Sequence, residues 1–359
     1  MKNNQWECLL SVIRGNNKRL ETAMIVDSPW IPGYCGINTI DYFARPDVWL
    51  SAHEKIKADF PNIIFLPDYW VEYGMALEPS GFGCKVDFYP NTPPTIHHVI
   101  KDADDTDSIE NLAIPDPKLS GLMPIALRLQ KYYSELLAEK EESIKIVSTR
   151  GPLTISSHLM GVTEFLMCIK INPDAAHTLI KKTTELCKRW LSAQLETVKT
   201  AEGILLLDDI CGFLSDEDYM EFAHPYLKDI FQFFSCKIKM MHNDSESDVI
   251  YPYLSDLGID IYQPTYVRPI SEIRKKIDNN ITILGTLPTL ALAENTPEYM
   301  HEATLNMINE YIQSNNGSIK HLLVSTGGGA PMGAKKECIE AVVSAVEQFN
   351  RDFDAQASK

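Results

Sequence analysis

Short apolar runs alternate along the chain with longer amphipathic stretches. Eight runs rich in β-branched and aliphatic residues predict strands at 22–26, 62–66, 144–148, 204–207, 237–241, 259–262, 281–284 and 322–324. Helical patterns with polar or proline-containing starts separate several of them, most clearly at 172–199, 215–234 and 296–313. Alternation of this kind indicates a parallel sheet covered by helices on both faces.

Eight strand-helix units favour closure of the sheet into a (β/α)8 TIM barrel with an elaborated N-terminal region. A length of 359 residues suits one such domain over 1–359. The segment from about 69 to 143 holds a predicted hairpin near 83–88 and Pro-rich loops, so we interpret it as an elaborated βα connection. A doubly wound open sheet is the alternative, because spacing alone does not establish closure.

Charge, cysteine content and the lack of long apolar runs indicate which partners, metal sites and cellular locations to expect. The chain has 33 Lys and Arg against 49 Asp and Glu, and its net charge of −16 would repel nucleic acid and an anionic membrane. The eight cysteines form no Cys-x-x-Cys pair, which argues against a zinc ribbon and against a secreted disulfide framework. The start lacks a basic stretch followed by an apolar run, and no later apolar stretch is long enough to span a membrane. We therefore expect a soluble cytoplasmic protein.

Polar residues follow the predicted strands, where barrels of this type carry their chemistry. Because strand side chains alternate, His242 and Asp244 should point the same way as Met240, into the barrel mouth. An imidazole and a carboxylate suit zinc, and the same pair could transfer protons without a metal. Residues able to complete a zinc site that stays open to substrate are Asp208, Asp209, Glu221, Glu78 and Cys211.

Several of these residues also have a purely structural interpretation. His242 could be a hydrogen-bonded structural histidine, and Asp208-Asp209 could cap a helix or bind backbone amides. Asp68 leaves an apolar strand, where burial would raise its pKa, or it is a loop acid exposed to water. The glycine triplet 327–329 resembles a phosphate-binding loop, but a tight backbone turn is the commoner use of such glycines.

Four motifs give the chain, from about 9 to 349, a resemblance to the uroporphyrinogen decarboxylase family in its broad sense, which includes corrinoid-dependent methyltransferases. They are Gly151-Pro152-Leu153-Thr154, Leu214 to Tyr219 with Phe222 and Pro225-Tyr226, His242-Asn243-Asp244, and Leu284-Gly285-Thr286 before Thr296-Pro297-Glu298. The resemblance implies a (β/α)8 barrel with its active cleft at the carboxyl ends of the strands, and it suggests a homodimer.

The substrate-binding residues of the family's decarboxylases are incomplete here. Asp68 resembles the aspartate that follows their second strand, but the end of the first strand, from Asp27 through Trp30 to Tyr34, has no arginine to bind substrate carboxylates. His158 stands where those enzymes carry a tyrosine, and their histidine near the eighth strand is missing. Decarboxylation of uroporphyrinogen itself is therefore disfavoured.

The zinc ligands of the family's methyltransferases are also altered. One group uses a His-x-Cys pair after the fifth strand and a Cys after the eighth; this chain keeps His242 but has Asp244 and Gly327 to Gly329 instead of the cysteines. A second group, acting on aromatic methyl ethers, uses glutamates and a histidine. Glu221 fits one of those glutamates, and Asp208 lies near the position of the other.

The resemblance favours a methyltransferase that moves a methyl group between a small O- or N-methylated compound and a corrinoid, supplied by a partner protein or as free cobalamin. The residues expected to act are His242, Asp244, Asp68 and Asp208 in catalysis, His242, Asp244, Glu221 and Asp208 on zinc, and Asp27, Trp30, Glu78, His158, Asp209, Gln263 and Gly328 on substrate. The alternatives are a cofactor-independent decarboxylase of a small acid, with Asp68 as proton donor, and a non-catalytic ligand-binding barrel.

Overall fold

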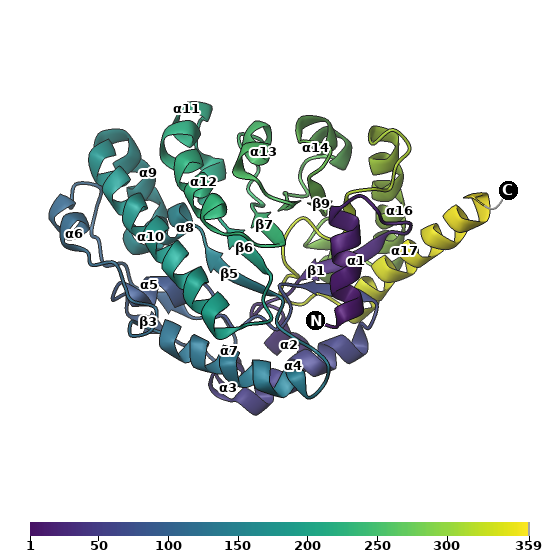
Figure 1. The fold of residues 1–359 in the computed structure, drawn as a ribbon, viewed down its shortest axis with the longest axis horizontal. Coiled ribbons are helices and arrows are strands. Elements are labelled where there is room, and N and C mark those ends of the chain that lie inside the picture. The colour runs from purple at the N-terminus through teal and green to yellow at the C-terminus, as the bar shows by residue number, and fades with distance from the viewer. Residues whose placement is uncertain (358–359) are drawn as a thin grey trace.

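The computed structural model describes residues 1–357 and has eight parallel strands surrounded by helices (Figure 1). The strands are β1 (Glu21–Ile25), β2 (Ile63–Leu66), β5 (Ile146–Arg150), β6 (Gly203–Leu207), β7 (Ile238–His242), β8 (Ile261–Gln263), β9 (Thr282–Leu284) and β10 (Leu322–Val324). All eight predicted strands are present. The third begins and ends two residues later than expected, so Arg150 is the last residue of β5 instead of a loop residue.

Pairing of the first strand with the last distinguishes this barrel from an open doubly wound sheet. The hydrogen-bonded order is β2-β1-β10-β9-β8-β7-β6-β5, and Thr22 of β1 lies opposite both Ile63 and Val324. A doubly wound sheet would instead reverse its strand order within the sheet. No ladder joins β2 to β5 within residues 1–357. The predicted (β/α)8 TIM-barrel fold is confirmed, with one seam between β2 and β5.

The long connection between β2 and β5 lies at this seam. It contains α5 (Leu77–Gly81), β3 (Val86–Asp87), β4 (Thr95–Ile96), α6 (Thr106–Asn111) and α7 (Met123–Ala138). β3 and β4 form the antiparallel hairpin that the sequence predicted. Glu78 of α5 accepts a hydrogen bond from the backbone amide of Arg150 at 2.9 Å, so the connection packs against the carboxyl end of β5.

Helices surround the strands, and one of them, α1, closes an end of the barrel. They are α1 (Asn3–Ile13), α2 (Ile31–Cys35), α3 (Thr39–Ala44), α4 (Pro46–Asp59), α8 (Pro152–Met160), α9 (Val162–Ile171), α10 (Pro173–Thr197), α11 (Asp216–Asp218), η2 (Tyr219–Ala223), α12 (His224–Phe233), α13 (Leu254–Leu257), α14 (Ile270–Lys276), α15 (Ala291–Glu294), α16 (Pro297–Ser314) and α17 (Lys336–Ala357), with single turns η1 (Ile210–Phe213) and η3 (Tyr251–Tyr253). The helix predicted over 215–234 is interrupted by the π-turn η2. Pro225 has no amide hydrogen for the regular bond to Glu221, which accounts for this interruption.

The barrel interior is filled by a cluster of apolar side chains separate from the layer beneath the outer helices. Ile238 and Met240 belong to the interior cluster, whereas Met241 belongs to the outer one. Trp6 and Leu9 of α1 join the interior cluster, and the amine of Met1 donates to the carbonyl oxygen of Ser143 at 2.6 Å, just before β5. α1 therefore closes the amino end of the barrel, and the opposite end is left for the strand-end residues.

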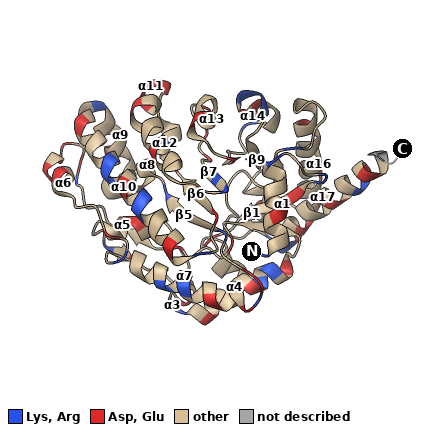
Figure 2. Cartoon of the chain, viewed as in Figure 1, with Lys and Arg blue, Asp and Glu red and all other residues tan. Residues whose placement is uncertain are grey.

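Charged residues of both signs are spread over the outer helices in the view of Figure 2. Within residues 1–357, no single helix is long and apolar enough to cross a membrane. α8 and α9 meet that test only as a pair, and the pair is bent by 105°.

Candidate metal centre at the barrel mouth

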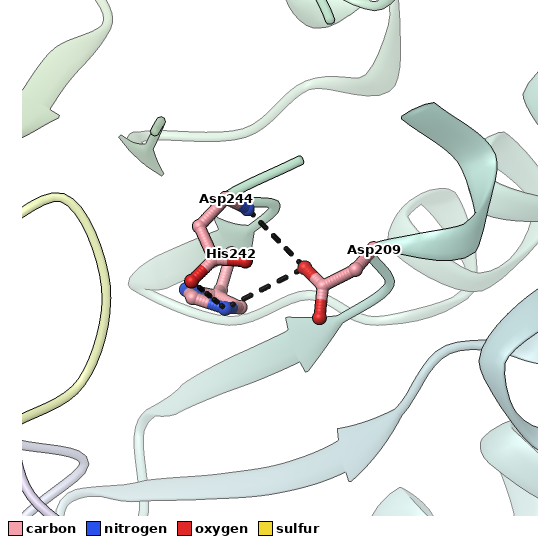
Figure 3. A group of neighbouring side chains, drawn as sticks. All are labelled: Asp209, His242 and Asp244. Carbon is pink, nitrogen blue, oxygen red and sulfur yellow. Dashed lines mark hydrogen bonds and ion pairs between the residues drawn. The ribbon is translucent and has the colours of Figure 1, made fainter. Parts of the chain in front are cut away.

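Three side chains with ligand atoms meet at the carboxyl ends of β6 and β7 (Figure 3). Asp209 follows β6, His242 ends β7, and Asp244 lies in the loop after β7. Nε2 of His242 lies 3.5 Å from Oδ1 of Asp209 and 3.9 Å from Oδ2 of Asp244. One ligand atom from each residue lies within 4.8 Å of the others. One imidazole and two carboxylates this close together form a donor set that suits zinc and leaves a position open.

Backbone contacts hold the two aspartates in place. The amide of Asp244 donates to Oδ1 of Asp209 at 3.2 Å, and the side-chain amide of Asn243 donates to the carbonyl oxygen of Asp208 at 2.8 Å. Gly328 forms the wall beside Asp244, because a Cβ there would lie 2.9 Å from Oδ2 of Asp244. Its φ of +149° is also a conformation that favours glycine. The triplet therefore leaves room for the Asp244 carboxylate.

Gln263 fixes the tautomer of His242. Its Nε2 donates to the carbonyl oxygens of Thr326 at 3.0 Å and Gly328 at 3.2 Å, so its Oε1 faces His242. That oxygen lies 2.6 Å from Nδ1 of His242 and can only accept, so Nδ1 carries the hydrogen. In the neutral ring, Nε2 then presents its lone pair to Asp209 and Asp244, as a metal ligand requires. Gln263, expected on substrate, is fully buried and positions the histidine.

Two carboxyls near His242 have altered acidity. Burial raises the pKa of Asp244, an effect that His242 opposes and Asp209 reinforces. The pKa of Asp27 is raised to about 7 by burial and by the charge of Glu72, and Arg150 and His242 act in the opposite direction. Asp27 therefore lies close enough to His242 to influence the same end of the barrel.

Asp208, expected on the metal, serves the start of α8 instead. Its carboxylate accepts hydrogen bonds from the amide of Leu153 at 2.9 Å and from the amide and hydroxyl of Thr154 at 3.2 and 2.9 Å. A Cβ on Gly151 would lie 2.3 Å from Oδ2 of Asp208. This contact explains the Gly-Pro-x-Thr motif as a closely packed helix start, in which Pro152 needs no amide partner. Burial raises the pKa of Asp208 to about 7.

Asp68 also points away from the three ligand residues. It has a left-handed φ of 57°, and its carboxylate lies 2.8 Å from the amine of Met1 and 2.7 Å from Nζ of Lys57. Burial favours a higher pKa, but these two positive charges outweigh it and lower the pKa of Asp68. The expected increase in its pKa is therefore wrong, because the sequence did not reveal the two cations.

Of the remaining candidates, Glu221 and Trp30 lie away from the three ligand residues, whereas Glu78 and His158 lie near Arg150. Glu221 is exposed on η2 and pairs with His177 at 3.4 Å, and Trp30 is 1% exposed with its indole donating to the carbonyl oxygen of Ala334. Neither joins the three ligand residues. Glu78 is buried against the end of β5. His158 is half-buried on α8, and burial together with the charge of Arg150 lowers its pKa to about 4.

Arg150 is a residue of the barrel mouth that was not among the site residues predicted from the sequence. It shares the inner face of β5 with Ile146, is only 5% exposed, and its guanidinium lies 4.9 Å from the ring centre of Trp70. Its place at the end of a predicted strand was the one signal that could have identified it. The misplaced boundary of that strand made it look like a loop residue.

A (β/α)8 barrel with one imidazole and two carboxylates at its mouth defines a class of candidate metal-dependent enzymes. The uroporphyrinogen decarboxylase family model matches residues 68–349, and the chain belongs to this family. It is 26% identical over 314 residues to a methylated-thiol–coenzyme M methyltransferase of Methanosarcina mazei, covering 84% of this chain and 79% of that protein. It is 23% identical over 288 residues to the uroporphyrinogen decarboxylase of Coxiella burnetii, covering 76% and 74%.

A solved methyltransferase from Methanosarcina mazei has the same fold, with a TM-score of 0.79 at 16% identity over 96% of this chain and 98% of that one. The family match and the methyltransferase relative confirm that the chain is an enzyme of this family, in its methyltransferase-like branch.

Proposed function

We propose that this protein moves a methyl group between a small methylated compound and a corrinoid, which a partner protein carries or which is supplied as free cobalamin. The observation that carries the proposal is the meeting of Asp209, His242 and Asp244 at the barrel mouth. The methyltransferase relatives support the reaction type. The family resemblance implies an O- or N-methylated compound, and the named relative extends the candidates to methylated thiols.

Zinc is the proposed metal, because the ligand atoms of His242, Asp209 and Asp244 suit it. The fixed tautomer gives His242 a free Nε2 lone pair, and both carboxylates offer an oxygen within 4.8 Å of it. Carboxylate and imidazole ligands occur together in catalytic zinc sites that keep one position open. Asp209 replaces Asp208 and Glu221 of the expected ligand set, because only Asp209 faces His242.

The proposed role of the metal follows from the charge that develops on the heteroatom when the methyl group leaves. When the bond between the methyl carbon and the heteroatom breaks, the heteroatom keeps its electron pair, and the corrinoid cobalt supplies the pair for the new bond. Zinc would act as a Lewis acid that stabilises the charge left on the heteroatom. His242 and the two aspartates would orient the heteroatom, and Asp27, a carboxyl whose pKa is raised to about 7 and is influenced by His242, would return a proton to it.

Exposed apolar side chains follow four of the strands at the barrel mouth. The loops that follow β6, β8, β9 and β10 each expose an apolar side chain: Phe213 is 60% exposed, Val267 49%, Leu290 51% and Met332 54%. Apolar side chains around an active-site opening are typical of protein interaction sites. They support docking of a corrinoid-bearing protein over the metal centre. A homodimer and a cytoplasmic location belong to the same proposal, and the eight unpaired cysteines suit a reducing compartment.

No observation favours the two alternatives. A decarboxylase would need Asp68 as a proton donor, but its ion pairs with Met1 and Lys57 favour the anion. The enzymes that the chain resembles argue against a non-catalytic barrel.

The test is anaerobic methyl transfer. Protein purified without oxygen and loaded with zinc is mixed with cob(I)alamin and a panel of methyl ethers, methylamines and methylated thiols, and methylcobalamin is followed by its absorbance. We expect methylcobalamin with at least one member of the panel. His242→Ala should abolish it, and His97→Ala, which removes an exposed histidine of the hairpin, should not. No zinc binding and no methyl transfer across the whole panel would refute the proposal.

A further inference from the structure

The guanidinium of Arg150 is buried at the mouth without an ionic partner. It is 5% exposed, and no ion pair joins it to a carboxylate anywhere in residues 1–357. Its polar contacts are weak ones: Nε lies 3.0 Å from Sδ of Met75, and Nη2 lies 3.4 Å from the carbonyl oxygen of Gly74. A buried charge is normally paired, so an unpaired one marks a place where a ligand supplies the counter-charge.

The acids near Arg150 do not pair with it. The charge of Arg150 lowers the pKa of Asp27, but no ion pair joins the two side chains in residues 1–357. Two other acids are engaged with the backbone. Oε1 of Glu78 accepts from the amide of Arg150 and from the hydroxyl of Thr149. Both oxygens of Glu72 accept backbone amides, from Ser28 and from Gly74. These carboxylates are thus held away from the guanidinium by bonds they would lose if they turned towards it.

Arg150 also lies in the same layer of the barrel as His242. Arg150 is opposite Leu207, and Leu207 is opposite His242, so Arg150 and His242 are two strands apart in one row. Neighbouring strands are about 4.8 Å apart, which puts the two Cα atoms roughly 10 Å apart. Both side chains face inward, so a compound only a few bonds long could touch both of them.

We infer that the methylated substrate carries a carboxylate, which Arg150 binds against Trp70 while the methyl-bearing heteroatom reaches His242. This inference rests on the proposed methyl transfer, since it names the class of compound that donates or accepts the methyl group. A guanidinium binds a carboxylate through parallel hydrogen bonds, and such a fork fixes the orientation of a small molecule as well as holding it.

Matched pairs of compounds test the inference by binding alone. Calorimetry on the zinc-loaded protein, without corrinoid, compares methoxyacetate with 2-methoxyethanol and (methylthio)acetate with 2-(methylthio)ethanol. The two members of each pair differ only in the carboxylate. We expect each acid to bind about ten- to a hundredfold more tightly than its alcohol, the range that charge-assisted hydrogen bonds give.

Variants identify the group responsible. Arg150→Met should abolish the preference for the acids, and Arg150→Lys, which keeps the charge but not the fork, should keep a smaller preference. Arg189→Met removes an exposed arginine of α10 and should change nothing. Thermal melting establishes which variants are folded. If Arg150→Met does not fold, the smaller preference expected of Arg150→Lys still tests the inference.

The inference is overturned if the acids do not bind, if acids and alcohols bind equally, or if the preference survives in folded Arg150→Met. Its failure can be distinguished from failure of the proposed function. Acid binding that depends on Arg150 without methyl transfer refutes only the reaction, whereas equal methyl transfer from acids and alcohols refutes only the role of Arg150.

Discussion

Gln263 offers the sharpest test of how the barrel positions His242. Its side chain is fully buried and makes three hydrogen bonds, to Nδ1 of His242 and to the carbonyl oxygens of Thr326 and Gly328. Gln263→Met keeps the length and approximate volume of the side chain but removes the amide. The imidazole is then free to take either tautomer and to rotate.

The expected magnitudes follow from these contacts. One buried donor, Nδ1 of His242, and one buried acceptor, the carbonyl oxygen of Thr326, lose their partner, whereas the carbonyl oxygen of Gly328 still accepts from the hydroxyl of Thr326 at 2.8 Å. Each unsatisfied group costs about 1–3 kcal/mol before water or relaxation compensates. We therefore expect the free energy of unfolding to fall by roughly 2–5 kcal/mol. Loss of the residue that orients a metal-binding histidine weakens metal affinity by about 10- to 100-fold. Zinc affinity is measured by competition with a chromophoric chelator, and stability by urea denaturation.

A matched control separates the two effects. Gln130 is also buried and donates to Gln194 at 2.8 Å, but it lies on α7, outside the barrel. Gln130→Met should lower the stability and leave zinc affinity unchanged. If folded Gln263→Met binds zinc as tightly as the parent protein, the argument from the tautomer is refuted.

Three further predictions concern the aspartates. Asp209→Asn and Asp244→Asn should each weaken zinc binding by roughly 100-fold or more, because loss of a residue that only orients a metal ligand already weakens binding by about 10- to 100-fold. The same chelator competition measures the affinity. Unchanged zinc affinity in either variant would remove that residue from the site. Asp208→Asn should lower the free energy of unfolding by about 1–3 kcal/mol, because an NH2 group replaces one of the two oxygens that accept from Leu153 and Thr154 at the start of α8. It should leave zinc affinity intact; a large loss of zinc binding by the folded variant would return Asp208 to the ligand set. In the metal-free protein, the folded state holds the proton of Asp27 up to pH about 7 while the unfolded chain releases it near pH 4, so its contribution to stability is greatest below pH 4 and falls as the pH rises to 7. Asp27→Asn should remove that decline from the stability profile, and identical profiles for the two proteins would show that its pKa is not raised.

The fold and the inward orientation of His242 could be predicted from the sequence. Apolar runs and helix starts identified all eight strands, and alternation along β7 placed His242 on the inner face with Met240. These signals are local, because the period of a strand decides which side chains share a face.

The errors arose where the outcome depends on contacts distant in sequence. Asp208 and Asp209 are adjacent acids at one strand end, and only the packing of α8 decides that Asp208 takes the helix amides and Asp209 faces His242. The pKa of Asp68 is lowered by Met1 and Lys57 against the effect of burial, and Glu72 and Glu78 accept hydrogen bonds from backbone amides instead of pairing with Arg150. None of these pairings has a local sequence signature.

The central claim is that a metal is held at the barrel mouth by one imidazole and two carboxylates. X-ray absorption at the zinc edge of the loaded protein tests it directly, because zinc–sulfur distances of about 2.3 Å are distinct from zinc–nitrogen and zinc–oxygen distances of about 2.0–2.2 Å. We predict nitrogen and oxygen neighbours alone, with the imidazole signal lost in His242→Ala. A sulfur neighbour, or a spectrum that His242→Ala leaves unchanged, would contradict the assignment.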